Sequence, residues 1–298
     1  MTQTQVWTIG KLLEWTTEFL RKSGSESARL DAEVLLAHAR SCQRIQLYTA
    51  FGEEASEAER TAFREMVRRR AEGTPVAYLV GHKEFFSLEF IVNSDCLIPR
   101  PETEHLVVAA LDWAKNRMKS MNGSRPLLIA DVCTGSGCVA VAMAKHLSNC
   151  ELMASDLCSA ALKVAESNIA KHGFGDRISL FHGDLLDAMP NTQAKLDMVL
   201  SNPPYVSAEE FKQLPKDIRE HEPASALLSG PSGFEVTERL LTQAAERLCE
   251  GGVVMLESSP MLVPKIEAFV QSQNLWHLAP TVKDFQGHAR IIIAERMR

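Results

Sequence analysis

The chain has 298 residues, of which 45% are hydrophobic and 23% are charged, so its composition is that of a folded protein rather than a disordered one. No apolar run approaches the roughly 18 residues that a membrane helix needs, and the N-terminus lacks the basic and apolar regions of a signal peptide. We therefore expect a cytoplasmic protein without a membrane segment. Seven cysteines without a Cys-x-x-Cys pair favour reduced thiols and predict no metal site.

The formal net charge of −6 bears on the class of partner. The first 75 residues hold 11 basic and 11 acidic side chains, so all of the excess negative charge lies beyond them. A groove that binds nucleic acid mainly through phosphates needs the opposite sign of charge. We therefore expect no direct binding of nucleic acid.

Residues 1–75 are predicted to form a small helical domain. Apolar side chains recur at helical spacing in residues 12–20 and again in residues 28–39. Ser56 and Glu59 have the spacing of a capping box, which predicts that a third helix begins there. Residues in the next segment, from 76 to 98, are rich in aromatic and β-branched types and predict a β-hairpin linker.

Apolar runs and helical patterns alternate in residues 99–298. The runs are LLIADV, ELMAS, ISLFHG, LDMVLS, VVMLE, LWHLAP and RIIIAE. Such alternation predicts an α/β domain with a mostly parallel, doubly wound sheet and helices on both faces. In sheets of this kind ligands bind at the carboxyl ends of the strands, so the residues that follow the runs are the candidates for a site.

A glycine-containing turn follows the first of these strands. It consists of Cys133, Thr134, Gly135, Ser136 and Gly137. The glycines allow a tight turn and a close approach of a ligand to the backbone, and the following helix presents free N–H groups. The turn alone could be structural or part of a dinucleotide site. A P-loop is excluded because no Gly-Lys-Ser/Thr follows.

Two carboxylates make the site more specific. Asp156 ends the second strand, where it can accept hydrogen bonds from both hydroxyls of a ribose. The alternative, that Asp156 caps the following helix, is weaker because Ser159 lies nearer the expected start. Asp184 follows the third strand and could accept from an adenine amino group while Leu185 packs on the ring, although a plain surface turn is possible there. Together these features predict an adenosine site without a phosphate-binding lysine, which fits S-adenosylmethionine.

The fourth strand ends in Asn202, Pro203, Pro204 and Tyr205. Proline has no N–H for a sheet ladder, so the chain must leave the sheet here in a stiff, extended conformation. The side-chain oxygen of Asn202 and the carbonyl of Pro203 are two acceptors that match a planar –NH2 group, and Tyr205 could stack on that group. Orienting both N–H bonds turns the nitrogen lone pair toward a methyl donor. The segment could be only a turn, but at this place in the fold it predicts an N-methyltransferase.

Several motifs extend this prediction along nearly the whole chain. They are GHKEFFSLEF, LIPRPETE, DVCTGSG, SNPPY, HEPASAL and DFQGHAR. With them the chain resembles the HemK/PrmC family of protein-glutamine N5-methyltransferases. Adenine-specific nucleic-acid methyltransferases share Asn-Pro-Pro-Tyr but are not expected to share IPRPETE before the glycine turn. An adenine N6-methyltransferase acting on DNA or RNA is therefore the second hypothesis, and a binding protein without turnover the third.

The resemblance implies a Rossmann-like, seven-stranded S-adenosylmethionine-dependent methyltransferase sheet with a small N-terminal helical domain. The implied substrate is the glutamine of the Gly-Gly-Gln motif in class I peptide-chain release factors, which the N-terminal helices would grip, and nothing in the sequence demands more than a monomer. Cofactor contacts are implied for Cys133 to Gly137, Asp156, Leu185 after Asp184, and Asn202, and substrate contacts for Asn202 to Tyr205.

Further residues are implied to support the site. Arg100 and Glu102 either order the loop beside the methyl donor or form a structural ion pair, and Glu222 and Arg290 are expected to pack around the site. Three places depart from the expected pattern. Cys133 stands where methyltransferases generally have the first glycine of the turn, although this family tolerates cysteine there, and its thiol is expected to pack under the turn rather than to react. Leu185 replaces an aromatic residue seen in some members, and the segment LESSPML lacks the glycine and glutamine associated with this point.

Overall fold

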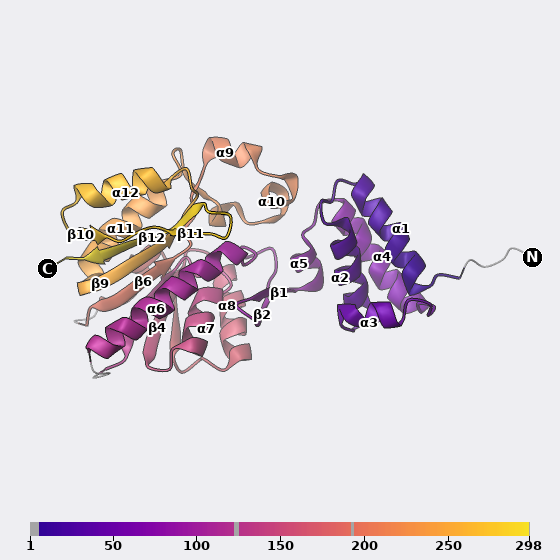
Figure 1. Cartoon of the computed structure of the whole chain (residues 1–298), viewed down its shortest axis with the longest axis horizontal. Helices are drawn as coiled ribbons and strands as arrows, with labels where there is room; N and C mark the ends of the chain where they lie inside the picture. Colours follow the sequence, from indigo (N-terminus) through magenta and orange to yellow (C-terminus); the bar gives the residue numbers. More distant parts are fainter. Residues whose placement is uncertain (1–5, 122–124, 192–193, 298) are drawn as a thin grey trace, which may run out of the picture. The chain divides into compact units, whose positions relative to one another are not determined.

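The computed structural model describes residues 6–121, 125–191 and 194–297. Figure 1 colours the chain from one end to the other, and the chain forms two compact units. The first contains the chain up to Gly81 together with Pro215–His221, and the second contains His82–Leu214 and the chain from Glu222 onward. The sequence pattern suggests continuous domains and does not reveal that a short later segment joins the helical unit. Within the described ranges, no helix has both the length and the apolar character that crossing a bilayer requires.

The first unit is helical, as predicted. Its helices are α1 (Ile9–Lys22), α2 (Ala28–Ala39), α3 (Arg44–Thr49), α4 (Glu57–Ala71), α5 (Val76–Val80) and α10 (Lys216–His221). The apolar faces of α1 and α2 are buried against each other, with Leu13 and Leu36 fully inaccessible. The capping box is confirmed, because the Ser56 hydroxyl accepts from the Glu59 N–H at 3.2 Å and the Glu59 carboxylate accepts from the Ser56 N–H at 2.7 Å.

The segment predicted as a hairpin from 76 to 98 begins differently. Residues Val76–Val80 form α5, which starts after Pro75 and ends at Gly81 with φ of 77°. The hairpin itself is shorter, with β1 (His82–Phe85) antiparallel to β2 (Leu88–Ile91). It is also part of the second unit rather than a free linker, because Phe85 and Phe90 belong to that unit's apolar core. The start of the hairpin was predicted too early because Val and Tyr have high strand propensity. Pro75 instead favours the start of a helix at Val76.

The second unit is built on a mostly parallel sheet, as expected. Its strands are β3 (Leu127–Val132), β4 (Cys150–Asp156), β5 (Ile178–His182), β6 (Leu196–Ser201), β9 (Leu248–Glu257), β10 (Trp276–Leu278), β11 (Val282–Lys283) and β12 (Ala289–Arg296). Seven of them lie in the order β10-β12-β9-β6-β3-β4-β5, and the short β11 pairs with β12 beside this path. Strands β9, β6, β3, β4 and β5 are parallel, whereas β12 is antiparallel to both neighbours. The predicted seven-stranded sheet is confirmed.

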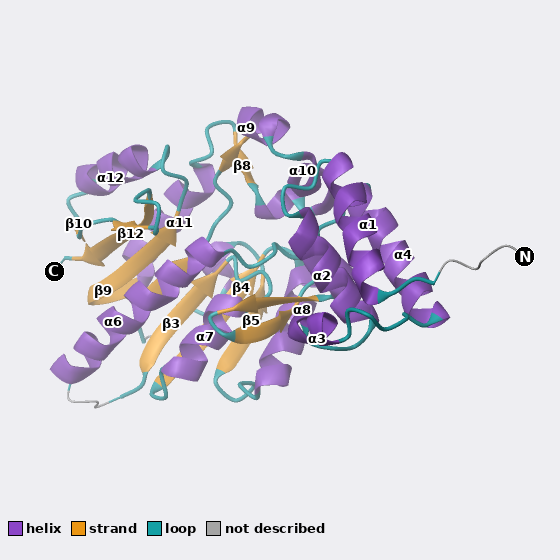
Figure 2. Cartoon of the chain, turned by 45° about the vertical axis from the view of Figure 1, so that its right-hand side comes forward, coloured by secondary structure: helices purple, strands orange, loops and turns teal. Residues whose placement is uncertain are grey.

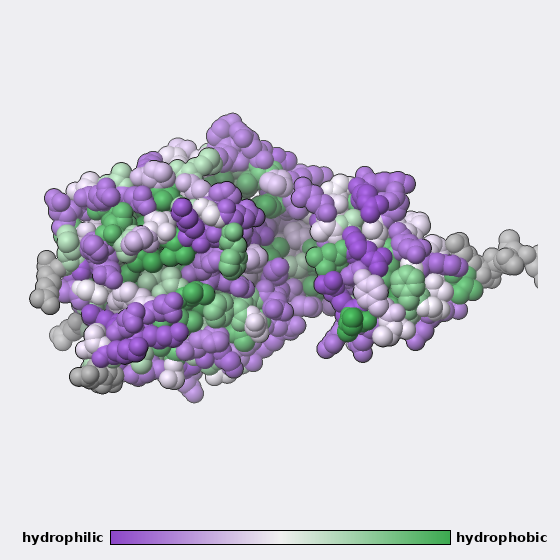
Figure 3. Space-filling view, viewed as in Figure 1, coloured by the Kyte–Doolittle hydropathy of each residue, from purple (hydrophilic) through white to green (hydrophobic). Residues whose placement is uncertain are grey.

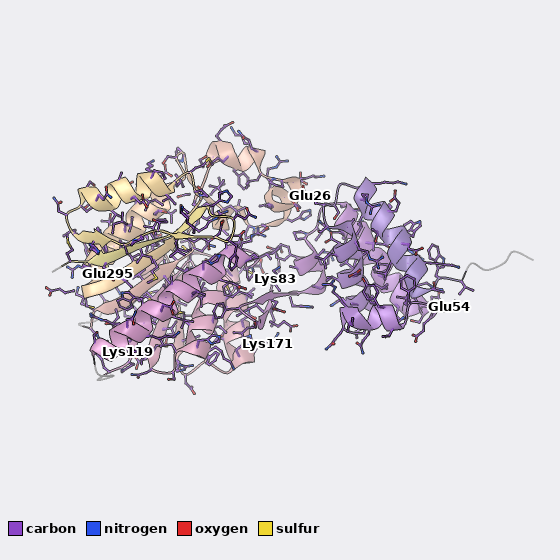
Figure 4. All side chains as sticks on the ribbon, in the orientation of Figure 1. Glu26, Glu54, Lys83, Lys119, Lys171 and Glu295 are labelled. Atoms are coloured by element: carbon purple, nitrogen blue, oxygen red, sulfur yellow. The ribbon has the colours of Figure 1, made fainter. Side chains whose placement is uncertain are left out.

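Helices cover both faces of this sheet (Figures 1 and 2). Helices α6 (Glu104–Ser120), α7 (Cys138–His146) and α8 (Ser159–His172) contribute to one apolar core, and α11 (Glu235–Arg247) and α12 (Val263–Ser272) contribute to the other. The remaining short elements are η1 (Pro101–Thr103), η2 (Leu185–Ala188), β7 (Val206–Ser207), α9 (Ala208–Gln213), η3 (Ala224–Ala226) and β8 (Leu228–Gly230). Side chains tie the layers together, for example Glu295 of β12, labelled in Figure 4, which accepts a hydrogen bond from Trp113 at 3.2 Å.

Asn168 of α8 forms hydrogen bonds with two separate segments, the end of β2 and the turn that contains Ser136. Its side chain is fully buried and bonds both backbone groups of Ile91, at 2.7 and 2.9 Å, while its amide also donates to the Ser136 carbonyl at 2.9 Å. Lys171, labelled in Figure 4, adds an ion pair to Glu89 of the hairpin at 2.7 Å. The hairpin and the glycine turn are thus both held by one helix.

We expect Asn168→Ala to lower the stability of the second unit. The substitution removes a hydrogen-bond partner from the buried Ser136 carbonyl and from the two part-buried backbone groups of Ile91. An unsatisfied buried group costs roughly 1–3 kcal/mol and a part-buried one less, so we expect a total of about 3 kcal/mol. Thermal unfolding should shift down by about 5–10 °C. Ser167→Ala, one residue earlier on an exposed side of the same helix, is the matched control, and equal melting temperatures for the two variants would contradict the assignment.

Candidate functional site

A cavity of about 550 Å³ lies at the carboxyl edge of the sheet, entirely within the second unit. Its volume is in the range of small-molecule sites in proteins. The predicted residues that line it are Cys133, Thr134, Gly135, Ser136, Asp156, Asp184, Leu185, Asn202 and Pro204. Gly137, Pro203 and Tyr205 are not among the lining residues, although each is next in the chain to one that is. The structure therefore gathers most of the predicted residues around one space.

Register explains why these residues meet. Val132 at the end of β3 lies opposite Ser155 of β4 and Ser201 of β6, so the three chains leave the sheet at the same level. Hydrogen bonds fix the exits, since the Ser201 hydroxyl donates to the Val132 carbonyl at 2.6 Å and the Ser155 hydroxyl donates to the Leu185 carbonyl at 2.9 Å. Neither serine was predicted to have this role. A serine within an otherwise apolar strand is the sequence signal for such a hydrogen bond to a neighbouring segment.

The glycine turn runs through left-handed backbone. Residues Cys133, Gly135 and Gly137 have φ of 59°, 56° and 78°. A non-glycine residue in this region costs roughly 1–2 kcal/mol, so Cys133 carries strain at a position where methyltransferases generally have glycine. Its thiol packs against the apolar core, and burial raises its pKa well above the usual range. The expectation that Cys133 packs under the turn is consistent with this, and the thiol is a poor nucleophile.

Asp156 is held by backbone donors at the end of β4. One carboxylate oxygen accepts from the Gly135 N–H at 2.8 Å and the other accepts from the Cys158 N–H at 2.9 Å. Burial raises the pKa of this carboxyl, and the backbone N–H groups oppose that rise. The expected helix cap at Ser159 is wrong, because Ser159 is already the first residue of α8 and Cys158 precedes it without a side-chain cap. Asp156 instead ties the end of β4 to the glycine turn.

Asp184 and Leu185 occupy the end of β5 as expected, but with an additional partner. The Asp184 carboxylate forms an ion pair with Arg239 of α11, and both residues line the cavity. Leu185 is buried with φ of 50°, so it is the second non-glycine residue, after Cys133, with left-handed backbone at the cavity. Arg239 was missed because it is one of several polar residues on an amphipathic helix, and the sequence does not say which of them faces Asp184.

Asn202 is fixed by a residue that sequence reasoning did not single out. Its side-chain Nδ2 donates to the Thr103 hydroxyl oxygen at 3.2 Å. Its side-chain oxygen accepts no hydrogen bond from the part of the chain that the structure describes, and Asn202 lines the cavity. The donor end of the amide is therefore occupied and the acceptor end is available. Thr103 lies inside the IPRPETE motif. The sequence analysis identified this motif but did not predict which of its residues would contact Asn202.

Buried ionisable groups surround this end of the cavity. Burial raises the pKa of the Tyr205 phenol to about 12, so it stays neutral at physiological pH. Burial likewise raises the pKa of Glu257, the last residue of β9, to about 7. Asp131, at the end of β3, is also almost inaccessible, and burial raises its pKa to about 7 although it accepts hydrogen bonds from Thr134 and Ala140. Asp131 and Glu257 were not predicted, since a carboxylate in an apolar run gives no sign of its surroundings.

Two ion pairs involve residues that the sequence analysis expected near the site, Arg100, which lines the cavity, and Arg290. Arg100 pairs with the buried Glu222, which also accepts from the Ile98 N–H at 3.3 Å, so Arg100 does form an ion pair but its partner is Glu222 and not Glu102. Arg290 pairs with Asp284 at 2.9 Å. In the LESSPML segment, Ser258 is fully buried and its N–H donates to the Arg290 carbonyl at 2.9 Å, so this departure from the family pattern begins in the buried interior.

Comparison with known families and proteins places these features in context. The family described as "PrmC N-terminal domain" matches residues 11–81, and "Methyltransferase small domain" matches residues 117–221. A Rhodopirellula baltica protein named release factor glutamine methyltransferase is 46% identical over 291 residues, which is 97% of each chain. Proteins of the same name are 35% identical in Nitratidesulfovibrio vulgaris, over 97% of this chain and 95% of theirs, and 31% identical in Bacillus anthracis, over 96% and 99%.

One solved structure supports the fold alone. The hMettl16 catalytic domain, solved in complex with the MAT2A 3′UTR hairpin 6, is 16% identical, with a TM-score of 0.53 over 78% of this chain and 82% of that one. At this level of identity the likeness concerns the arrangement of the sheet and helices and not the ligand.

The two left-handed glycines of the turn should differ in their response to alanine. A Cβ at Gly137 would lie 3.2 Å from the Ala165 Cβ and 3.3 Å from its backbone Cα, whereas a Cβ at Gly135 meets nothing within 4 Å. Gly137→Ala should therefore lose about 2–3 kcal/mol, and Gly135→Ala only the roughly 1 kcal/mol of left-handed strain. Chemical denaturation of both variants measures the difference, and equal losses would show that contact with α8 is unimportant.

Proposed function

Because the chain belongs to the release factor glutamine methyltransferase family, we propose that it transfers a methyl group from S-adenosylmethionine to a release-factor glutamine. The acceptor would be the side-chain nitrogen, N5, of the glutamine in the Gly-Gly-Gln motif of class I release factors. One observation carries this proposal from family to mechanism. It is the orientation of Asn202, whose Nδ2 is bound to Thr103 and whose oxygen is left as an acceptor at the cavity.

The cavity fits the cofactor. Asp156 is fixed by two backbone N–H groups and would accept hydrogen bonds from the ribose hydroxyls, and Leu185 and Asp184 would contact the adenine. Gly135 leaves open space where a side chain would stand, which allows the backbone to approach a ligand. When bound there, S-adenosylmethionine supplies a methyl group activated by a sulfonium sulfur. No cluster of metal-ligating side chains occurs among the residues that the structure describes.

The acceptor end of the cavity fits a primary amide. An amide nitrogen is a weak nucleophile because its lone pair is delocalised. The Asn202 oxygen and the Pro203 carbonyl would each accept one N–H of the glutamine, which orients the nitrogen and polarises it without removing a proton first. Both prolines are buried, so this receptor is rigid. Tyr205 follows them in the chain and stays neutral, and its ring would stack on the planar amide.

The helical unit would hold the body of the release factor. Trp15 of α1 is 53% exposed, and its ring stacks on that of Phe19 with centroids 5.1 Å apart. Trp7 meets the edge of Trp15 at 6.4 Å, so the three rings form one aromatic cluster. Figure 3 shows hydrophobic residues at the surface of this unit among hydrophilic ones. Exposed, mutually ordered aromatic residues are typical of protein-binding surfaces.

The proposal is tested with methyl-labelled S-adenosylmethionine and three acceptors, which are a class I release factor, the same factor with its Gly-Gly-Gln glutamine changed to alanine, and an adenine-rich oligonucleotide. We expect label on the intact factor alone. Label on the oligonucleotide would favour the adenine N6-methyltransferase instead. In the same assay Asn202→Ala should lower kcat about 10²-fold or more and keep most of the cofactor affinity, because one pre-aligned acceptor is lost. Asn149→Ala, at the opposite edge of the sheet, is the control.

We expect Trp15→Ala to raise KM for the intact release factor by roughly fivefold or more while kcat changes little, since removal of an aromatic anchor typically costs above about 1 kcal/mol of binding. Leu275→Ala, which truncates a side chain of similar exposure in the second unit, should leave KM unchanged. Steady-state kinetics against varied release factor measures both. A fall in kcat without a change in KM would remove the helical unit from the role of partner-binding surface.

A further inference from the structure

The orientation of Asn202 depends on which way the Thr103 hydroxyl points. A hydroxyl has one proton to donate and two lone pairs with which to accept. Thr103 is 3% exposed, and it accepts from Asn202 Nδ2 at 3.2 Å. If its proton pointed at Asn202 instead, the amide would turn and present its –NH2 group to the cavity. An amide in that orientation would repel the substrate amide rather than receive it.

Glu257 supplies a second partner for Thr103. Because Ser201 of β6 lies opposite Leu256 of β9, the next residue on each strand, Asn202 and Glu257, leaves the sheet side by side. Glu257 is 2% exposed, so burial raises the pKa of its carboxyl group, and a side-chain hydrogen bond with Thr103 opposes that rise. One carboxyl oxygen of Glu257, Oε2, is buried without a geometric hydrogen-bond partner among the described residues. A carboxylate only accepts, so it draws the Thr103 proton toward itself and away from Asn202.

We propose that Glu257 and Thr103 are positioning residues that set the orientation of the Asn202 amide through a chain of hydrogen bonds from Asn202 to Thr103 to Glu257. The chain is directional. The carboxylate accepts from the hydroxyl, the hydroxyl accepts from Asn202 Nδ2, and Asn202 Oδ1 is thereby turned toward the acceptor nitrogen. This inference rests on the proposed function, since it concerns the residue that receives the glutamine amide.

The charge on Glu257 makes the chain sensitive to pH. The groups that face this carboxyl from neighbouring elements are Glu102 and Arg100 before α6, Arg290 on β12, and Tyr205 after β6. Burial raises the pKa of Glu257 more than the positive charges of the two arginines lower it, so the pKa is about 7. The carboxylate therefore forms as pH rises from 6 to 8, and it is a stronger acceptor than the protonated acid. Orientation of Asn202 should accordingly be firmer at pH 8 than at pH 6.

Three variants separate positioning from packing. Thr103→Val keeps the volume and removes the hydroxyl, Thr103→Ser keeps the hydroxyl and removes a methyl group, and Glu257→Gln keeps the shape and removes the charge. We expect Thr103→Val to lower kcat roughly tenfold or more, as misorientation of a positioning group does, with KM for S-adenosylmethionine within about twofold of wild type. Thr103→Ser should retain most of kcat. Equal losses in the valine and serine variants would overturn the proposal, because they would show that packing is what matters.

A second measurement needs no substrate or cofactor. In the ligand-free protein with 15N-labelled asparagine, the side-chain amide signal of Asn202, assigned with Asn202→Ala, should shift with pH around 7. The shift should vanish in Glu257→Gln and in Thr103→Val. A shift that persists in both variants would assign the titration to another carboxyl, such as Asp131, and would overturn the chain.

The two measurements also distinguish this inference from the proposed function. If wild-type protein labels no release factor but the Asn202 signal titrates through Glu257, the substrate assignment fails and the hydrogen-bond chain stands. If the release factor is labelled and neither Thr103→Val nor Glu257→Gln changes kcat or the titration, the function stands and the chain is wrong.

Discussion

Parallel pairing in register is the constraint on which the site depends. Backbone hydrogen bonds between β3, β4 and β6 set Val132, Ser155 and Ser201 at one level, and the chain must then leave the sheet at three adjacent points. Because the ladder is continuous and buried, none of these exits can shift without moving a whole strand across the core. The glycine turn, Asp156 and Asn202 are consequently placed by the same interaction that stabilises the fold. The chemistry at the edge needs only short-range adjustments, made by side-chain hydrogen bonds.

Strain and buried polarity both concentrate at this edge. Two non-glycine residues, Cys133 and Leu185, adopt left-handed backbone at the cavity wall, and Asp131 and Glu257 are carboxyls whose pKa is raised by burial. Each feature costs stability, and the surrounding parallel strands, which are buried on both faces, offset that cost. A binding cavity at the edge of a rigid sheet can therefore hold groups in conformations and protonation states that a loop on its own would not maintain.

The sequence was informative where a pattern has a single physical cause. Alternating apolar runs and helical stretches require a doubly wound sheet, the capping box at Ser56 requires a helix start, and two prolines after a strand require an exit from the sheet. It was uninformative where the cause is tertiary. Nothing in VAYLV distinguishes the helix α5 from a strand, and nothing in IPRPETE singles out Thr103 as the residue that touches Asn202. The partners of Asp184 and Arg100 likewise come from elements more than fifty residues away. Ion pairs of this range are set by the fold, so they can be identified only after it.

The arrangement around Asn202 argues for catalysis by orientation rather than by proton abstraction. The neighbouring ionisable groups are poor bases toward an amide, because Tyr205 stays protonated and Glu257 is buried and does not line the cavity. An amide nitrogen, moreover, is far too weak an acid for a carboxylate to deprotonate before reaction. Under the proposed function, the site would instead provide a pair of fixed acceptors, Asn202 oriented by its hydrogen bond to Thr103 and the Pro203 carbonyl held between two prolines. Such acceptors bind the N–H groups most strongly as the nitrogen develops positive charge, so the same geometry that binds the amide favours the transition state over the ground state.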